Sequence, residues 1–113
     1  MIKIYHNSRC GKSRAGLAIL EKSNVPFEII KYLETPLNIQ ELKSIIDILG
    51  IKPIDLIRIN EKIWIENFKG KLLTDDEIVA AITQFPILME RPIVIHNNKG
   101  VIGRPPENIE TLL

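Results

Sequence analysis

The first 32 residues carry the pattern that most restricts how this chain can fold. Apolar and polar residues alternate over residues 2–5, which predicts a short buried strand. Apolar residues then recur at helical spacing from residue 13 to about residue 23, and a break at 24–26 precedes a second alternating stretch at 27–32. A strand, a helix and a strand in this order make a βαβ unit, so the two strands should lie parallel.

The rest of the chain predicts a helical segment, a hairpin and a last helix. Two capping boxes and one proline mark the starts of helices: Asn38 with Glu41, Thr74 with Glu77, and Pro53. Strands at 93–96 and 101–102 flank a turn at 97–100, and a helix should begin at about residue 107. This order predicts an α/β, thioredoxin-like fold: a mixed four-stranded sheet with a helical insertion between its βαβ and ββα halves. We expect one domain over residues 1–113.

Charge and cysteine content narrow the possible functions. The net charge is +1, which provides no general attraction to nucleic acid or to a membrane surface. No apolar run approaches the ~18 residues of a membrane span, and no signal-peptide pattern precedes the first strand, so we expect a cytoplasmic protein. One cysteine excludes an internal disulfide and a multi-cysteine zinc site. Any thiol redox chemistry must therefore take its second thiol from another molecule.

The single cysteine, Cys10, lies where the first strand gives way to the first helix. Free N–H groups and the helix dipole favour an anion there, and the same field favours thiolate over thiol. Gly11 lets the backbone approach closely, His6 can fold back toward the sulfur, and the Ser13 hydroxyl can donate to it. Taken alone, however, a lone cysteine is more often a small buried hydrophobe. Three cations close to Cys10 indicate a basic turn exposed to solvent: Arg9, Lys12 and Arg14.

Three further arginines stand in suggestive contexts, although any one of them alone would usually be a surface residue. Arg58 follows an apolar turn, Arg91 precedes Pro92 at a strand start, and Arg104 precedes the last helix. In a thioredoxin-like fold the loop before the third strand lies beside the first helix's N-terminus, which places Arg91 near Cys10. We also expect the Arg91–Pro92 peptide to be cis. Arginine's fork of N–H donors suits an oxyanion better than lysine does.

Four motifs together resemble one known family. They are Tyr-His-Asn-x-x-Cys-x-x-Ser-Arg at 5–14, Tyr-Leu-Glu-Thr-Pro at 32–36, Leu-Met-Glu-Arg-Pro-Ile-Val at 88–94 and Gly-Arg-Pro-Pro-Glu at 103–107. In order and spacing they resemble the glutaredoxin-coupled, ArsC-type arsenate reductases, in particular the bacterial branch called arsenate-reductase-like. The resemblance covers the chain from its first strand to its last helix.

The resemblance implies a cytoplasmic oxidoreductase that reduces arsenate to arsenite. Cys10 would be the nucleophile, His6 would help to lower its pKa, and three arginines would bind the oxyanion: Arg58, Arg91 and Arg104. The Cys10 thiolate would attack arsenic(V), glutathione would add as co-substrate and reduce the arsenic, and glutaredoxin would resolve the mixed species. We expect a monomer with no bound cofactor or metal.

Three other interpretations remain open from the sequence. Spx-type regulators share the fold and bind RNA polymerase, but they carry a Cys-x-x-Cys switch that Ser13 removes here, and they lack the arginine that Arg104 provides. A monothiol oxidoreductase or iron–sulfur carrier resembling monothiol glutaredoxins would fit the Cys10 to Ser13 spacing, but it would not require the helical insertion or the arginines. The third interpretation keeps the enzyme and changes the oxyanion or thiol substrate.

Overall fold

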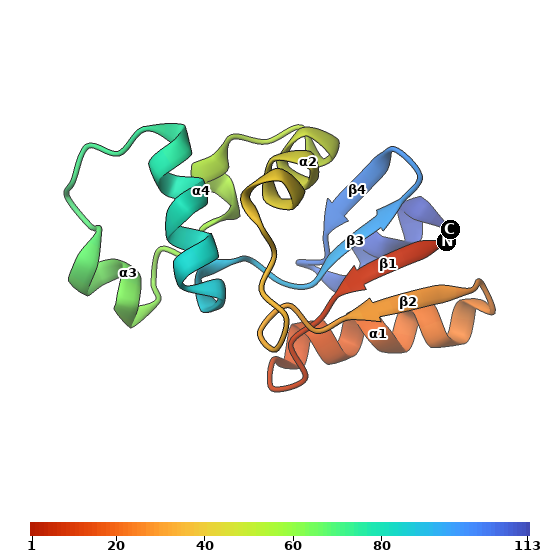
Figure 1. Cartoon of the computed structure of the whole chain (residues 1–113). Helices are drawn as coiled ribbons and strands as arrows, with labels where there is room; N and C mark the ends of the chain where they lie inside the picture. The colour runs from red at the N-terminus through yellow and green to blue at the C-terminus, as the bar shows by residue number, and fades with distance from the viewer. The chain divides into compact units, whose positions relative to one another are not determined.

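The computed structural model describes residues 1–113, and its contacts divide the chain into two compact units (Figure 1). The first, called the sheet unit here, consists of Met1–Thr35 with Arg91–Leu113, and the second, the helical unit, is Pro36–Glu90. The sheet unit contains β1 (Ile2–Tyr5), α1 (Gly11–Ser23), β2 (Phe27–Ile30), β3 (Ile93–His96), β4 (Lys99–Ile102) and the 3-10 helix η3 (Pro106–Leu112). The helical unit contains α2 (Ile39–Leu49), η1 (Pro53–Leu56), α3 (Lys62–Asn67), α4 (Asp75–Gln84) and η2 (Pro86–Leu88).

The strand order confirms the predicted mixed four-stranded sheet. The strands lie in the order β2-β1-β3-β4, with β1 parallel to β2 and antiparallel to β3, and with β3 antiparallel to β4. Ile4 is opposite Ile29 on one side and opposite Val94 on the other. This β-α-β then β-β-helix topology is the thioredoxin-like fold, and it brings the end of β1 and the start of β3 together.

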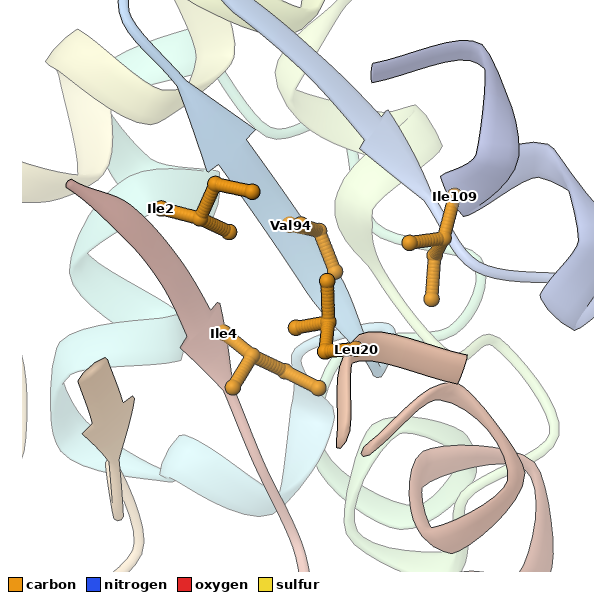
Figure 2. Packing of buried hydrophobic residues seen from close by; sticks show 5 residues of the cluster. All are labelled: Ile2, Ile4, Leu20, Val94 and Ile109. Carbon is orange, nitrogen blue, oxygen red and sulfur yellow. The ribbon is translucent and has the colours of Figure 1, made fainter. Parts of the chain in front are cut away.

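One face of the sheet packs against α1 and η3, which also contact each other. The fully buried residues of this core are Ile2, Ile4, Leu20, Val94 and Ile109. Figure 2 shows the two β1 isoleucines beside Val94 of β3, with the side chains of Leu20 and Ile109 coming from the two helices. Aliphatic side chains therefore fill the core, and each one that is fully buried contributes roughly 1.5–3 kcal/mol of transfer free energy.

The Pro92 ring, which is fully buried just before β3, lies close to Gly16, Gly103 and Ile109. A Cβ on Gly16 of α1 would lie 2.9 Å from Pro92 Cγ and 2.8 Å from Ile109 Cδ1. A Cβ on Gly103 would lie 2.8 Å from the same Pro92 Cγ. Only glycine at both positions lets α1 and the loop after β4 approach Pro92 this closely.

Gly16→Ala should therefore destabilise the fold, whereas Gly11→Ala in the same helix should not. A Cβ on Gly11 meets only Arg14 Nη2, at an ordinary 3.8 Å. Both substitutions replace a helical glycine by alanine and gain similar helix propensity. The difference between their free energies of unfolding therefore measures the clash at Pro92. We expect Gly16→Ala to lower the free energy of unfolding by about 1–3 kcal/mol relative to Gly11→Ala, measured by urea denaturation. Equal stabilities would show that α1 can shift away from Pro92 without cost.

The helical unit begins both of its longer helices with the predicted capping boxes. Asn38 and Glu41 exchange side-chain and backbone hydrogen bonds at the start of α2, and Thr74 and Glu77 do so at the start of α4. The weakly patterned stretch after residue 60 contains α3, whose Trp64 ring stacks on Phe68 with centroids 5.2 Å apart. Neither unit contains a helix long and apolar enough to cross a membrane.

Three boundaries and one helix type differ from the sequence prediction. The second strand, predicted over 27–32, ends at Ile30. The first helix begins at Gly11 rather than at residue 13, because Cys10 occupies the N-cap position. The hairpin turn is shorter than predicted, because Asn97 adopts φ 59° and allows β4 to begin at Lys99. The last helix is 3-10 rather than α.

Candidate functional site

The loop from β1 to α1 holds Cys10 at the helix N-terminus in an extended conformation, with φ −96° and ψ 123°. Asn7, which is only 5% exposed, organises this loop. Its carbonyl accepts from Cys10 N at 3.0 Å, its side-chain oxygen accepts from Arg9 N at 3.0 Å, and its own N–H donates to Ser13 Oγ at 3.0 Å. The sulfur is therefore carried on a loop whose backbone is internally hydrogen-bonded.

His6 follows β1 and bonds to Ser13 rather than to Cys10. His6 Nδ1 lies 2.7 Å from Ser13 Oγ, and both side chains are buried. Burial, together with the positive charges of Lys31 and Arg14, lowers the pKa of His6, and an interaction with the Ser13 backbone opposes this only partly. The ring is therefore neutral near pH 7. We expected the Ser13 hydroxyl to donate to the sulfur, but it bonds His6 and Asn7 instead.

Arg91 and Arg104 both lie beside the sulfur of Cys10. Arg104 Nη1 lies 3.9 Å from Cys10 Sγ and donates to the Arg91 carbonyl at 3.2 Å. The Arg91 side chain, in a residue only 7% exposed, hydrogen-bonds to Cys10. The Arg91–Pro92 peptide is cis, as predicted, and the Arg104–Pro105 peptide is also cis. Two guanidinium groups thus flank one half-buried thiol.

These surroundings favour the thiolate form of Cys10. Burial raises the pKa of the thiol, but the N–H of Ser13, the Arg91 side chain and the N–H of Lys12 together lower the pKa from 9.0 to about 7. The helix N-terminus and Arg91 therefore outweigh desolvation.

Alkylation of Cys10 by iodoacetamide should follow this pKa. The thiolate is the reactive form and is populated above the pKa, so the rate should rise tenfold per pH unit and level off above about pH 7. The folded protein also binds fewer protons than the unfolded chain between about pH 7 and 9.0, so stability should rise with pH across that window. If the alkylation rate instead has its midpoint near the pKa of an ordinary thiol, the proposed activation of Cys10 is wrong.

The other sequence candidates have smaller or separate roles. Lys12 acts on the sulfur through its backbone N–H, and Arg14 Nη1 donates to the Ser8 carbonyl at 3.2 Å. Arg58 belongs to the helical unit, where its Nε lies 3.4 Å from Glu61 Oε1. Arg58 Nη1 is buried and has no hydrogen-bond partner.

Three positioning residues were not predicted from the sequence. Asn7 belongs to the first motif, and its place in a Tyr-His-Asn run was the signal for a structural role in the loop. Gly16 and Gly103 support Pro92, and thus the peptide that follows Arg91. Gly103 begins the last motif, but nothing in the sequence marks Gly16. No group of three or more His, Cys, Asp or Glu residues could hold a metal ion.

Comparisons with known proteins agree with this geometry. The sequence model described as the ArsC family matches residues 5–112. The chain is 43% identical to the arsenate reductase of Neisseria meningitidis, over 99% of this chain and 97% of that protein. It is 37% identical to the arsenate reductase of Escherichia coli K12, over 99% of this chain and 80% of that protein. The solved structure of an arsenate reductase from Vibrio cholerae covers 99% of this chain and 97% of its own, with 40% identity and a TM-score of 0.94. This chain belongs to the ArsC family.

Proposed function

We propose that this protein is an arsenate reductase in which Cys10 is the nucleophile. The observation that carries the proposal is the convergence of Arg91 and Arg104 on a thiol whose pKa is lowered to about 7. Two guanidinium groups beside a thiolate suit a tetrahedral oxyanion that must be both bound and attacked. The relatives from Neisseria meningitidis and Escherichia coli are arsenate reductases, which supports the same substrate.

In the first step the Cys10 thiolate attacks arsenic(V). A sulfur–arsenic bond forms, one arsenic–oxygen bond breaks, and the oxygen leaves as water after protonation. Arg91 and Arg104 offset the negative charge of the arsenate and of the transition state. Neutral His6, bonded to Ser13, is suited to pass a proton rather than to supply a fixed positive charge. Gly11 leaves open space at the helix N-terminus, and Pro92 supports Arg91.

The remaining steps require thiols from other molecules because the chain has one cysteine. The thiolate of glutathione replaces a second oxygen on arsenic, which again leaves as water. A glutaredoxin thiolate then attacks the glutathione sulfur and forms a mixed disulfide with it. The bond between the glutathione sulfur and arsenic breaks, and its electron pair stays on arsenic, which is thereby reduced to arsenic(III). Water then releases arsenite and restores the Cys10 thiol. A reducing compartment such as the cytoplasm suits these reactions.

Arg58 is the third arginine of the proposed oxyanion site. The support for this role is the resemblance to the ArsC family, whose sequence model spans Arg58. The reaction needs no bound cofactor or metal, and we propose that the protein works as a monomer with glutathione and glutaredoxin as its partners.

The test is a coupled assay of NADPH oxidation with glutathione, glutaredoxin and glutathione reductase, with and without arsenate. We expect a rate that depends on arsenate, on glutathione and on this protein together. A rate that is unchanged by arsenate would overturn the proposal. Arsenate-dependent turnover that proceeds without glutaredoxin would keep the substrate and reject the partner.

A further inference from the structure

A hollow of about 250 Å³ lies at the loop that leads from β1 to Cys10. Its lining includes His6, Arg9, Lys31, Leu33 and Glu34. Pockets for small organic ligands measure about 300–1,000 Å³, so this hollow is slightly smaller than that range. It is therefore large enough for one end of a small peptide but not for a whole one.

The walls of this hollow are the loops that follow the two parallel strands. His6 N donates to the Ile30 carbonyl at 2.9 Å, which joins the end of β1 to the end of β2. After β2, the N–H groups of Glu34 and Thr35 both donate to the Lys31 carbonyl at 3.0 Å, forming a tight turn. Crevices outside the carboxyl ends of parallel strands are the usual ligand sites of α/β sheets.

The charged residues of the lining have opposite signs, and none is neutralised by a neighbour. Arg9 and Lys31 are positive and Glu34 is negative, and no ion pair joins any of them to another side chain. A simple anion would be repelled by Glu34, and a simple cation by the other two. The arrangement suits a zwitterion that presents a carboxylate and an ammonium group together.

We propose that this hollow binds the γ-glutamyl end of glutathione, with its carboxylate at Arg9 and Lys31 and its ammonium group at Glu34. The proposal rests on the proposed function, which makes glutathione the co-substrate. An extended tripeptide spans about 10 Å, and Arg9 is the residue before Cys10, with consecutive Cα atoms ~3.8 Å apart. A glutathione held by its γ-glutamyl end can therefore place its sulfur near that of Cys10.

The test measures binding of S-methylglutathione, which cannot react, to the whole protein by NMR titration. We expect chemical-shift changes in residues 6–9 and 31–34, and about fivefold weaker binding to Glu34→Gln and to Lys31→Gln. Lys22→Gln is the matched control, since Lys22 lies in the last turn of α1 and does not line the hollow. S-methyl-cysteinylglycine, which lacks the γ-glutamyl group, should bind weakly and equally to the original protein and to Glu34→Gln.

Equal affinity of S-methylglutathione for the original protein and Glu34→Gln, or shift changes confined to other residues, would overturn the site. Because this measurement needs no turnover, it is independent of the arsenate assay. Binding with the expected Glu34 dependence but no arsenate reduction would reject the proposed function and retain the site. Arsenate reduction with the same KM for glutathione in the original protein and in Glu34→Gln would retain the proposed function and reject the glutathione site.

Discussion

Replacement of Cys10 by serine is expected to reduce arsenate-dependent turnover to background. The helix N-terminus and Arg91 lower the pKa of the Cys10 thiol from 9.0 to about 7, so much of it is thiolate at neutral pH. A serine hydroxyl in the same place is far less acidic and remains protonated at neutral pH, so the nucleophile is lost while the arginines remain. The measurement is the coupled NADPH assay with arsenate.

The control for Cys10→Ser is the stability of the folded protein. Cys10 is half-buried and hydrogen-bonds through its backbone to Asn7, which serine retains. We expect the free energy of unfolding to change by less than about 1 kcal/mol. Arsenate binding should also persist, since Arg91 and Arg104 are unchanged. Residual arsenate-dependent turnover above background in a folded Cys10→Ser protein would remove Cys10 from the role of nucleophile.

The fold of the sheet unit was predictable because its apolar residues repeat at regular strand and helix spacings. Apolar residues alternate in β1 and repeat at helical spacing in α1, and the connection between two parallel strands leaves little choice of topology. The hairpin turn was predicted too long because the sequence does not state which residue adopts a left-handed conformation, and Asn97 does. The α3 helix was missed because six residues carry too little pattern.

The site was predictable in its residues but not in its contacts. Strand-to-helix position placed Cys10 at an anion-binding N-terminus, and the fold placed Arg91 beside it. The bond between His6 and Ser13 was not visible in the sequence, because it depends on how the loop around Asn7 closes. The packing of Pro92 between two glycines joins segments far apart in the chain, and no local pattern reports it.

Removal of the Arg91 side chain is the second large effect that we expect. Arg91 acts on Cys10 through a hydrogen bond and through its charge, from a position that is only 7% exposed. Arg91→Ala removes both, so the pKa of Cys10 should rise from about 7 toward 9.0. The value of kcat/KM for arsenate at neutral pH should fall about a hundredfold or more, as expected when one donor to a developing oxyanion is lost.

Two further variants separate the charge of Arg91 from its geometry. Arg91→Lys keeps a positive charge but loses the fork of N–H donors, so it should recover part of the pKa shift and little of the arsenate affinity. Lys12→Ala is the matched control: it removes a cation two residues from Cys10, but the backbone N–H by which Lys12 lowers the pKa of Cys10 remains. Iodoacetamide titration and kcat/KM for arsenate are measured on each, with urea denaturation to correct for the folded fraction. If Lys12→Ala shifts the Cys10 pKa as far as Arg91→Ala does, general positive charge, and not the placement of Arg91, activates the thiol.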